Sequence, residues 1–211
     1  MSIADLRKEY TLGGIRRKDL DPDPIRQFQK WFQQAVEVVP EANAMVLATA
    51  DREGKPSVRV ILLKGIDERG FSFFTNYQSR KSRELAENPH AAIAFYWAAL
   101  ERQVSITGAV SRLSRQESEE YFKSRPRGNR LGAWASKQSQ VIANRAELEE
   151  RMKAVETRFP GDDIPIPDNW GGYLLVPSAI DFWQGRPNRL HDRFCYTKEA
   201  SGHWRLDRLS P

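Results

Sequence analysis

The most suggestive chemistry in this 211-residue sequence lies in residues 183–193, which contain an indole, three arginines, a histidine and a carboxylate around a turn with glycine and proline. In an extended chain, Arg189 and His191 are two residues apart and share a face. The side chains of such a pair could converge on one substrate. With three histidines and one cysteine in the whole chain, we expect no metal site.

Two further clusters of cations stand beside apolar segments. Arg80 and Lys81 follow Ser79 at a predicted helix start, where backbone N–H groups and the helix dipole favour a bound anion. Arg59 and Lys64 bracket an apolar run, and on a regular strand residues five apart point to opposite faces. The same patterns also fit a solvated helix start and the surface ends of a strand.

A third basic segment follows a predicted helix. Tyr121 and Arg125 precede a Pro-Arg-Gly-Asn stretch that ends at Asn129, and its proline and glycine let the chain turn sharply. This segment is either an anion site or an exposed basic loop. The sequence has no P-loop, Rossmann glycine fingerprint, nucleophile elbow or paired-cysteine motif. Spacing alone therefore predicts binding of phosphorylated small molecules and leaves the reaction open.

The net charge of +5 and the pI of about 9.4 fit nucleic acid, an acidic membrane surface or small anionic ligands. No long basic run or basic amphipathic helix is present, which disfavours nucleic acid. No apolar stretch approaches a membrane span, and the first ten residues lack the apolar core of a signal peptide. The single Cys195 rules out an internal disulfide and fits a reducing compartment, so we expect a cytoplasmic protein with no membrane partner.

Hydrophobic periodicity predicts a β-rich fold. We expect residues 1–20 to form a mobile arm or lid and residues 21–211 to form a single domain. Helices are predicted over 25–39, 79–88, 114–123 and 144–159, and strands over 44–50, 58–64, 71–75, 91–97, 103–113, 172–176, 180–183, 193–197 and 204–209. Local patterns predict a helix start at Asp21-Pro22-Asp23-Pro24, a capping box of Ser114 with Glu117, and hairpin turns at Asp51-Arg52-Glu53-Gly54 and Ser201-Gly202. Turns too short for crossover helices link the early strands, which excludes a doubly wound sheet. The expected fold is α+β and mainly β, with short strands in a small antiparallel barrel and helices around it.

Nine short motifs resemble the pyridoxine 5′-phosphate oxidase family, in the family's order and spacing over residues 6–211. They are Arg59-Val-Ile-Leu-Leu-Lys64, Ser79-Arg-Lys81, Glu101-Arg-Gln103-Val, Ser124-Arg-Pro-Arg127, Gly132-Ala-Trp134, Lys137-Gln-Ser139, Trp170-Gly-Gly172, Phe182-Trp-Gln-Gly185 and Arg189-Leu-His-Asp-Arg193. The resemblance implies an FMN-binding split barrel and a homodimer with two flavins at the subunit interface.

The resemblance also implies two sets of ligand-binding residues. The FMN set is Arg59, Val60, Lys64, Phe74, Thr75, Arg80, Lys81, Gln103, Gln138, Ser139, Trp183 and Arg193. The substrate set is Arg7, Tyr10, Lys64, Tyr121, Arg125, Asn129, Arg189 and His191, with the last two at the reacting ring. Position 129 departs from the many relatives that have serine, although asparagine can also donate to a phosphate oxygen. Glu41 stands where some relatives have aspartate, and we assign it no role.

The activity that the resemblance implies is oxidation of pyridoxine or pyridoxamine 5′-phosphate to pyridoxal 5′-phosphate, with O2 as acceptor and hydrogen peroxide as product. We expect Arg189 to hold the substrate ring over the flavin and His191 to contact the 4′ hydroxyl or amine. His191 could act there as a general base or only position the substrate. Two alternatives stay open: a related flavin oxidase with another aromatic substrate, and a non-catalytic carrier of FMN or pyridoxal phosphate.

Overall fold

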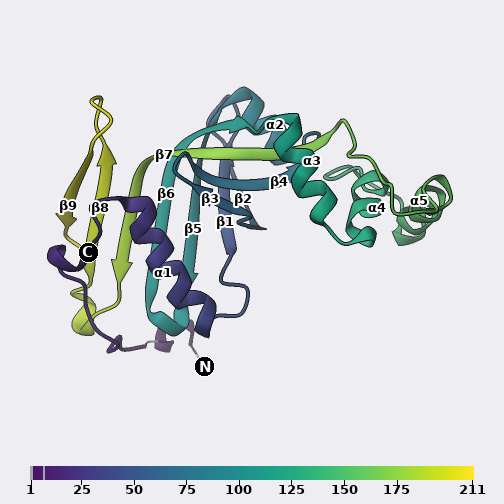
Figure 1. Cartoon of the computed structure of the whole chain (residues 1–211). Helices are drawn as coiled ribbons and strands as arrows, with labels where there is room; N and C mark the ends of the chain where they lie inside the picture. Colours follow the sequence, from purple (N-terminus) through teal and green to yellow (C-terminus); the bar gives the residue numbers. More distant parts are fainter. Residues whose placement is uncertain (1, 7) are drawn as a thin grey trace.

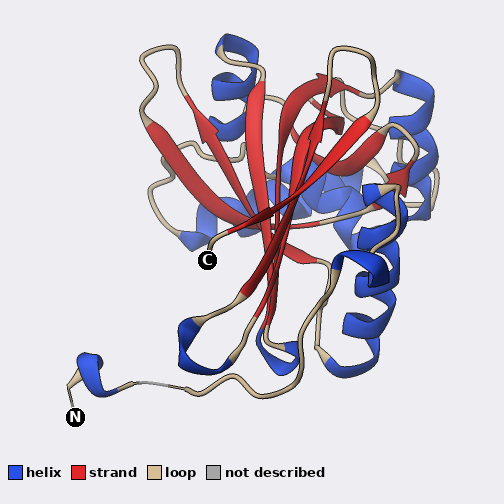
Figure 2. Ribbon diagram, turned by 90° about the vertical axis from the view of Figure 1, so that its left-hand side faces the viewer, coloured by secondary structure: helices blue, strands red, loops and turns tan. Residues whose placement is uncertain are grey.

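The computed structural model describes residues 2–6 and 8–211, and an antiparallel sheet forms its centre (Figures 1 and 2). The strands found in this part of the chain are β1 (Ala44–Ala50), β2 (Pro56–Leu62), β3 (Gly65–Asp67), β4 (Gly70–Asn76), β5 (His90–Trp97), β6 (Arg102–Arg112), β7 (Trp170–Gln184), β8 (Asp192–Lys198) and β9 (Trp204–Leu209). Their order is β2-β1-β5-β6-β7-β4-β3, with β8 between β7 and β9. The predicted mainly β, hairpin-linked α+β fold is confirmed, and it contains one short strand, β3, that was not predicted.

Local turn chemistry explains the hairpins. In the turn between β1 and β2 the Asp51 carboxylate accepts from the backbone N–H groups of Glu53 and Lys55, and Gly54 has a φ of 81°. Gly202, with a φ of 87°, turns β8 into β9. Both turns were predicted, because glycine adopts positive φ without a steric penalty.

The two ends of the strand path, β2 and β3, are consecutive along the chain, so the sheet must curl until they meet. The backbone N–H of Leu63 donates to the carbonyl of Asn43 at 2.9 Å, and that of Lys64 donates to the carbonyl of Ser72 at 2.9 Å. These two bonds extend the β1–β2 and β3–β4 pairings into the β2–β3 connection and so place Lys64 between the two ends of the strand path. Because β2 ends at Leu62, Lys64 lies beyond the strand, and the prediction that Arg59 and Lys64 share one strand was wrong.

One long strand, β7, replaces the two strands predicted over 172–176 and 180–183. Its first part pairs with β4 and its last part with β8, while β6 runs along its other edge. The register between β6 and β7 shifts at Thr107 and Gly108, so Pro177, which has no N–H, falls at a bulge. A bulge is not visible as alternation in the sequence, and the proline there suggested a break.

Helix α1 (Pro24–Val38) packs against the curled sheet and fills the main core (Figure 1). Its predicted start is confirmed, because the Asp23 side chain accepts from the backbone N–H groups of Ile25 and Arg26. Phe28 is fully buried, and its ring centroid lies 4.9 Å from that of Phe71 on β4.

The other helices are α2 (Arg80–Glu87), α3 (Arg115–Ser124), α4 (Arg127–Ala135) and α5 (Arg145–Arg158), with 3₁₀ turns η1 (Ile3–Asp5), η2 (Arg17–Asp19), η3 (Ala98–Leu100) and η4 (Pro187–Arg189). The predicted capping box of Ser114 and Glu117 at the start of α3 is present. Helix α4 was not predicted, because Gly128 and Gly132 weaken its helical pattern. A second apolar cluster that includes Phe122, Leu131 and Trp170 packs α3 and α4 beside β7. No helix in the described part of the chain is long and apolar enough to cross a membrane.

Candidate functional site

A cavity of about 510 Å³ opens where the β2–β3 connection, β4 and helices α2, α3 and α4 meet. We call it the main cavity. Its lining includes eight of the predicted site residues: Lys64, Phe74, Thr75, Lys81, Tyr121, Arg125, Asn129 and Gln138. These residues come from segments spread over 75 positions of sequence, from 64 to 138, so the fold brings together four of the motifs that the sequence singled out.

Lys81 lines the main cavity, and the residue is only 7% exposed. Its Nζ donates to Thr75 Oγ1 and Gln138 Oε1, each at 3.0 Å, and to Ser79 Oγ at 3.3 Å. All three acceptors are neutral oxygens. Burial, together with the nearby charge of Arg59, lowers the pKa of Lys81 to about 8. A buried cation with neutral partners is well suited to receive a phosphate.

Glu84 organises the cations next to Lys81. Its buried carboxylate accepts from Ser57 Oγ at 2.6 Å, Arg80 Nε at 2.8 Å and Arg59 Nη2 at 3.4 Å, and also from Thr49 Oγ1. Burial alone would raise the pKa of Glu84, but these hydrogen bonds and the charge of Arg59 lower it to about 2. Glu84 was not among the predicted site residues. Its position four residues after Arg80 on a helix was the available signal.

The segment after α4 reaches the start of α2. The backbone N–H of Arg80 donates to Ser139 Oγ at 3.3 Å, and Ser139 has a φ of 68°. Arg59, Arg80 and Ser139 therefore lie close to Lys81, next to the residues that line the main cavity. Val60, which was also predicted for FMN, is 68% exposed and lies on the open face of β2.

An aromatic stack also lines the main cavity. The ring centroids of Phe74 and Tyr121 lie 3.9 Å apart with an interplanar angle of 18°, and Trp170 is nearly parallel to Tyr121 at 6.2 Å. The Arg125 guanidinium lies 4.6 Å from the Trp170 ring, and burial lowers its pKa. Among the described residues, Arg125 Nη1 is a buried side-chain nitrogen without a hydrogen-bond partner. A buried, unpaired donor beside a cavity is what an anionic ligand would satisfy.

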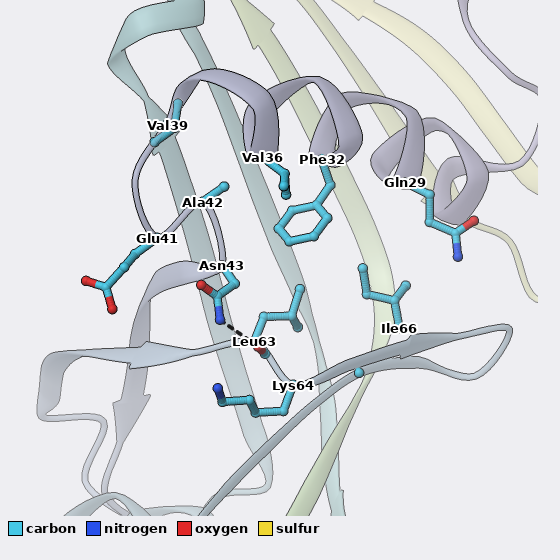
Figure 3. Close-up of a pocket in the computed structure, with 11 residues that line it drawn as sticks. Gln29, Phe32, Val36, Val39, Glu41, Ala42, Asn43, Leu63, Lys64 and Ile66 are labelled. Atoms are coloured by element: carbon cyan, nitrogen blue, oxygen red, sulfur yellow. Dashed lines mark hydrogen bonds between the residues drawn. The ribbon is translucent and has the colours of Figure 1, made fainter.

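Lys64 also borders a second cavity, of about 550 Å³, between α1 and the β2–β3 connection (Figure 3). Its lining is largely apolar and includes Phe32, Val36 and Ile66, and Glu41 also contributes to it. Of the predicted site residues that the structure describes, Lys64 alone reaches this space. The chemistry of the side chains therefore points to the main cavity as the functional one.

The remaining predicted residues gather at the other end of β7. The sheet register places Gln103 beside Trp183 and Trp183 beside Arg193, while the His191 ring lies 4.5 Å from Trp183. We call this group the β7-end cluster; it also contains Arg189 and Tyr10, and Arg7 lies outside the described residues. Phe74 pairs with Gly172, eleven residues before Trp183, so roughly 35 Å of strand separates the cluster from the main cavity. The fold of one chain does not bring the two groups together.

The backbone around Arg189 is strained. Asn188 and Arg189 have φ values of 57° and 59°, a conformation that costs free energy in residues other than glycine and is common at functional sites. The backbone N–H of Arg186 donates to His191 Nδ1 at 3.0 Å. In a neutral imidazole this bond leaves the proton on Nε2, so that nitrogen is a donor.

Two family models match this chain. Residues 32–159 match the model described as pyridoxamine 5′-phosphate oxidase, and residues 170–211 match the one described as the pyridoxine 5′-phosphate oxidase C-terminal dimerisation region. A protein of Paraburkholderia phymatum named pyridoxine/pyridoxamine 5′-phosphate oxidase is 56% identical, with 100% of this chain and 99% of the relative covered. A protein of the same name from a Cyanothece species is 55% identical over the same shares.

Solved structures agree with these sequence matches. The crystal structure of PhzG from Burkholderia lata, in complex with tetrahydrophenazine-1-carboxylic acid, has a TM-score of 0.87 and 32% identity, covering 92% of this chain and 95% of that one. A pyridoxamine 5′-phosphate oxidase-related, FMN-binding protein from Nostoc punctiforme has a TM-score of 0.73 at 19% identity, covering 91% and 100%, and this likeness concerns the fold. The chain therefore belongs to the pyridoxamine 5′-phosphate oxidase family.

Proposed function

We propose that this protein is an FMN-dependent oxidase that converts pyridoxine 5′-phosphate or pyridoxamine 5′-phosphate to pyridoxal 5′-phosphate. The observation that carries the proposal is the main cavity, which has one cation group around Lys81 and another at Lys64 and Arg125, with an aromatic stack beside the second. Two cation groups suit two phosphate monoesters, one on the cofactor and one on the substrate. The family membership supports the same reaction.

The Lys81 side of the main cavity fits the phosphate of FMN. Lys81 has neutral hydrogen-bond partners, and Arg59 and Arg80 already have their charges oriented by Glu84. We assign to FMN the residues Arg59, Val60, Lys64, Phe74, Thr75, Arg80, Lys81, Gln138 and Ser139 of one protomer. When bound, FMN would supply the two-electron redox chemistry of the reaction, with O2 as the final acceptor and hydrogen peroxide as the product.

The substrate phosphate fits the side with the unpaired Arg125. Lys64, Tyr121 and Asn129 line the same space, and Asn129 projects from α4 within the cavity lining. An arginine with a buried free N–H group and a lysine offer charge-assisted hydrogen bonds to phosphate, while the Tyr121 hydroxyl and the Asn129 amide can donate further bonds. This set favours a phosphorylated substrate over the unphosphorylated vitamin.

We propose that the β7-end cluster completes the site of a second copy of this chain. The cluster lies too far along β7 to serve the main cavity of its own chain, and residues 170–211 match a dimerisation region. The sheet also exposes Val46, Val58 and Val60, which is an apolar face that a partner would cover. In the homodimer, Gln103, Trp183 and Arg193 would contact the flavin, and Arg189 and His191 would contact the substrate ring.

Within that dimer, Arg189 would hold the substrate ring and His191 would orient the 4′ group. Because Nδ1 of His191 already accepts from Arg186, Nε2–H is placed to donate to the 4′ hydroxyl or amine rather than to remove a proton from it. We therefore assign His191 a positioning role. We further propose that residues 1–20 form an arm over a single domain of residues 21–211, and that the protein is cytoplasmic, in keeping with its single cysteine.

The test is oxygen consumption by the purified, FMN-loaded protein with pyridoxine 5′-phosphate, pyridoxamine 5′-phosphate or unphosphorylated pyridoxine. We expect oxygen uptake with the phosphorylated substrates, stoichiometric pyridoxal 5′-phosphate, and little uptake with pyridoxine. If a flavin-saturated protein consumed no oxygen with either phosphate ester, the proposal would be wrong. A tight complex without turnover would then indicate a carrier, and turnover of another aromatic compound would indicate a related oxidase.

A further inference from the structure

Glu101 occupies an unusual place between η3 and β6. It is 2% exposed and has a φ of 54°, in the left-handed region that non-glycine residues seldom adopt. Its backbone carbonyl accepts from the N–H of Gly185 at 2.8 Å, which ties it to the end of β7. The proposed function gives this buried carboxylate no part to play.

The Glu101 side chain binds a distant segment of the chain. Its Oε2 accepts from the backbone N–H groups of Thr11 at 2.8 Å and Leu12 at 3.0 Å, and Oε1 pairs with Lys8 Nζ at 3.4 Å. Burial alone would raise the pKa of Glu101, but the hydrogen bonds from Leu12, Lys8 and Thr11 lower it below its usual range. One ionised carboxylate thus fixes residues 8–12 from both sides of Tyr10.

Tyr10 lies directly against the β7-end cluster. Its ring meets the Trp183 ring edge to face at 5.5 Å and the His191 ring at 5.6 Å. The approach to β7 is so close that a Cβ at Gly185 would lie 2.6 Å from Tyr10 Cγ. The family resemblance placed Tyr10 in the substrate set. Its contacts with Trp183 and His191 support that assignment, because these two residues are proposed to contact flavin and substrate.

We propose that Glu101 is a positioning residue that holds Tyr10 against Trp183 and His191, and so shapes the substrate side of the site. The inference rests on the proposed function, because it takes the β7-end cluster to be the part of the site nearest the reacting ring. Glu101 itself touches neither Trp183 nor His191 through its carboxylate, and acts through residues 8–12. Loss of its charge should weaken substrate binding, while FMN stays bound through its phosphate contacts at the Lys81 side of the main cavity.

The experiment is a double-mutant cycle in the FMN-loaded dimer, with Glu101→Gln, Tyr10→Ala and the double variant. Glu101→Gln should raise KM for pyridoxine 5′-phosphate about tenfold, the loss expected for one charged hydrogen-bond acceptor, with kcat within about twofold and flavin content unchanged. In the Tyr10→Ala background the same substitution should change KM little. Glu149→Gln, an exposed carboxylate on α5, is the matched control.

Equal KM increases in both backgrounds would overturn the proposal, since Glu101 would then act independently of Tyr10. If Glu101→Gln fails to fold, Lys8→Glu tests the same contact, because Lys8 is the exposed partner of Glu101. An unchanged KM in Lys8→Glu would also overturn the proposal.

Limited proteolysis with trypsin, followed as cleavage after Arg16, tests the same contact in the absence of substrate. It therefore reports on the arm of residues 1–20 even if the protein oxidises neither phosphate ester. In that case only the proposed function fails. Cleavage that is faster in Glu101→Gln than in the parent protein supports the contact between Glu101 and the arm, and an unchanged rate overturns it.

Discussion

At the scale of single residues, the feature with the clearest physical consequence is the buried ammonium of Lys81. Its three hydrogen-bond partners are neutral, and its pKa is lowered to about 8. A bound phosphate dianion would stabilise the protonated form and raise that pKa again. If Lys81 binds the FMN phosphate as proposed, cofactor binding should be coupled to the uptake of a proton above pH 8.

We expect the affinity for FMN to fall as pH rises above about 8, by at most about tenfold per pH unit, because binding then requires protonation of Lys81. Fluorescence titration of the apoprotein with FMN measures this directly. Lys81→Met should bind about 100-fold more weakly at neutral pH, since a charged hydrogen bond is lost, and should show a flat profile across the same range. A steep profile in Lys81→Met would assign the titration to another group.

The same residue predicts how the stability of the apoprotein depends on pH. Its pKa is about 8 in the folded protein and 10.5 in the unfolded chain, so between these values the unfolded state binds more protons. The free energy of unfolding contributed by Lys81 should therefore rise with pH in this window. Denaturant unfolding of the parent protein and of Lys81→Met at several pH values isolates the contribution, and a parallel pH dependence in both would contradict it.

Substitutions of Arg189 and Arg80 should have opposite effects on catalytic activity and on bound FMN. Arg189→Ala removes an exposed side chain at the β7-end cluster, so we expect kcat/KM to fall about 100-fold or more while bound flavin stays near one per protomer. Arg80→Ala should instead lower flavin content, with activity restored by excess FMN. Flavin content that falls in parallel with activity in Arg189→Ala would refute its assignment to the substrate.

At the scale of secondary-structure elements, the continuity of β7 decides the geometry of the site. The strand starts beside the main cavity at Trp170 and ends at the β7-end cluster, and the bulge opposite Gly108 lets it pass Pro177 without a break. Helix α4 also determines the geometry of the site, because it places Asn129 in the lining of the main cavity. Both elements depend on contacts that are remote in sequence.

Gly108→Ala tests the importance of the bulge. A Cβ at this position would lie 2.0 Å from the Val176 carbonyl oxygen, so backbone must move. We expect a loss of about 1–3 kcal/mol in unfolding free energy and a melting temperature lower by several degrees. Gly161→Ala is the control, because nothing lies within 4 Å of its Cβ position. Equal melting temperatures for the two variants would contradict the close approach of β6 and β7.

At the scale of the whole molecule, the separation of the main cavity from the β7-end cluster predicts that each protomer contributes two half-sites to the homodimer. Mixing two inactive variants, Arg125→Ala and Arg189→Ala, should therefore restore activity when their subunits exchange. Each heterodimer would contain one intact site, so random exchange should recover roughly a quarter of the parent activity. Activity that stays at the level of the separate variants after confirmed exchange would place the complete site within one chain.

Much of this protein was set by its sequence. The hairpin turns at Gly54 and Gly202, the Asp23 cap and the Ser114–Glu117 capping box follow from interactions between residues a few positions apart, so local patterns predicted them. The cation clusters were likewise visible in the sequence, and the family motifs assigned them to FMN and substrate. What these patterns could not supply was which clusters lie together.

Tertiary structure decided which clusters lie together, because that outcome depends on strand register and on packing between residues far apart in the sequence. Glu84 joins Arg59 to Arg80 only after β2 packs beside α2, and Trp170 reaches Tyr121 only after β7 packs against α3. The contact between Glu101 and residues 8–12 spans about 90 positions and leaves no periodic signal in the sequence. Strand length then separates the main cavity from Trp183 and His191, since a β-strand is too stiff to fold one end of β7 back onto the other.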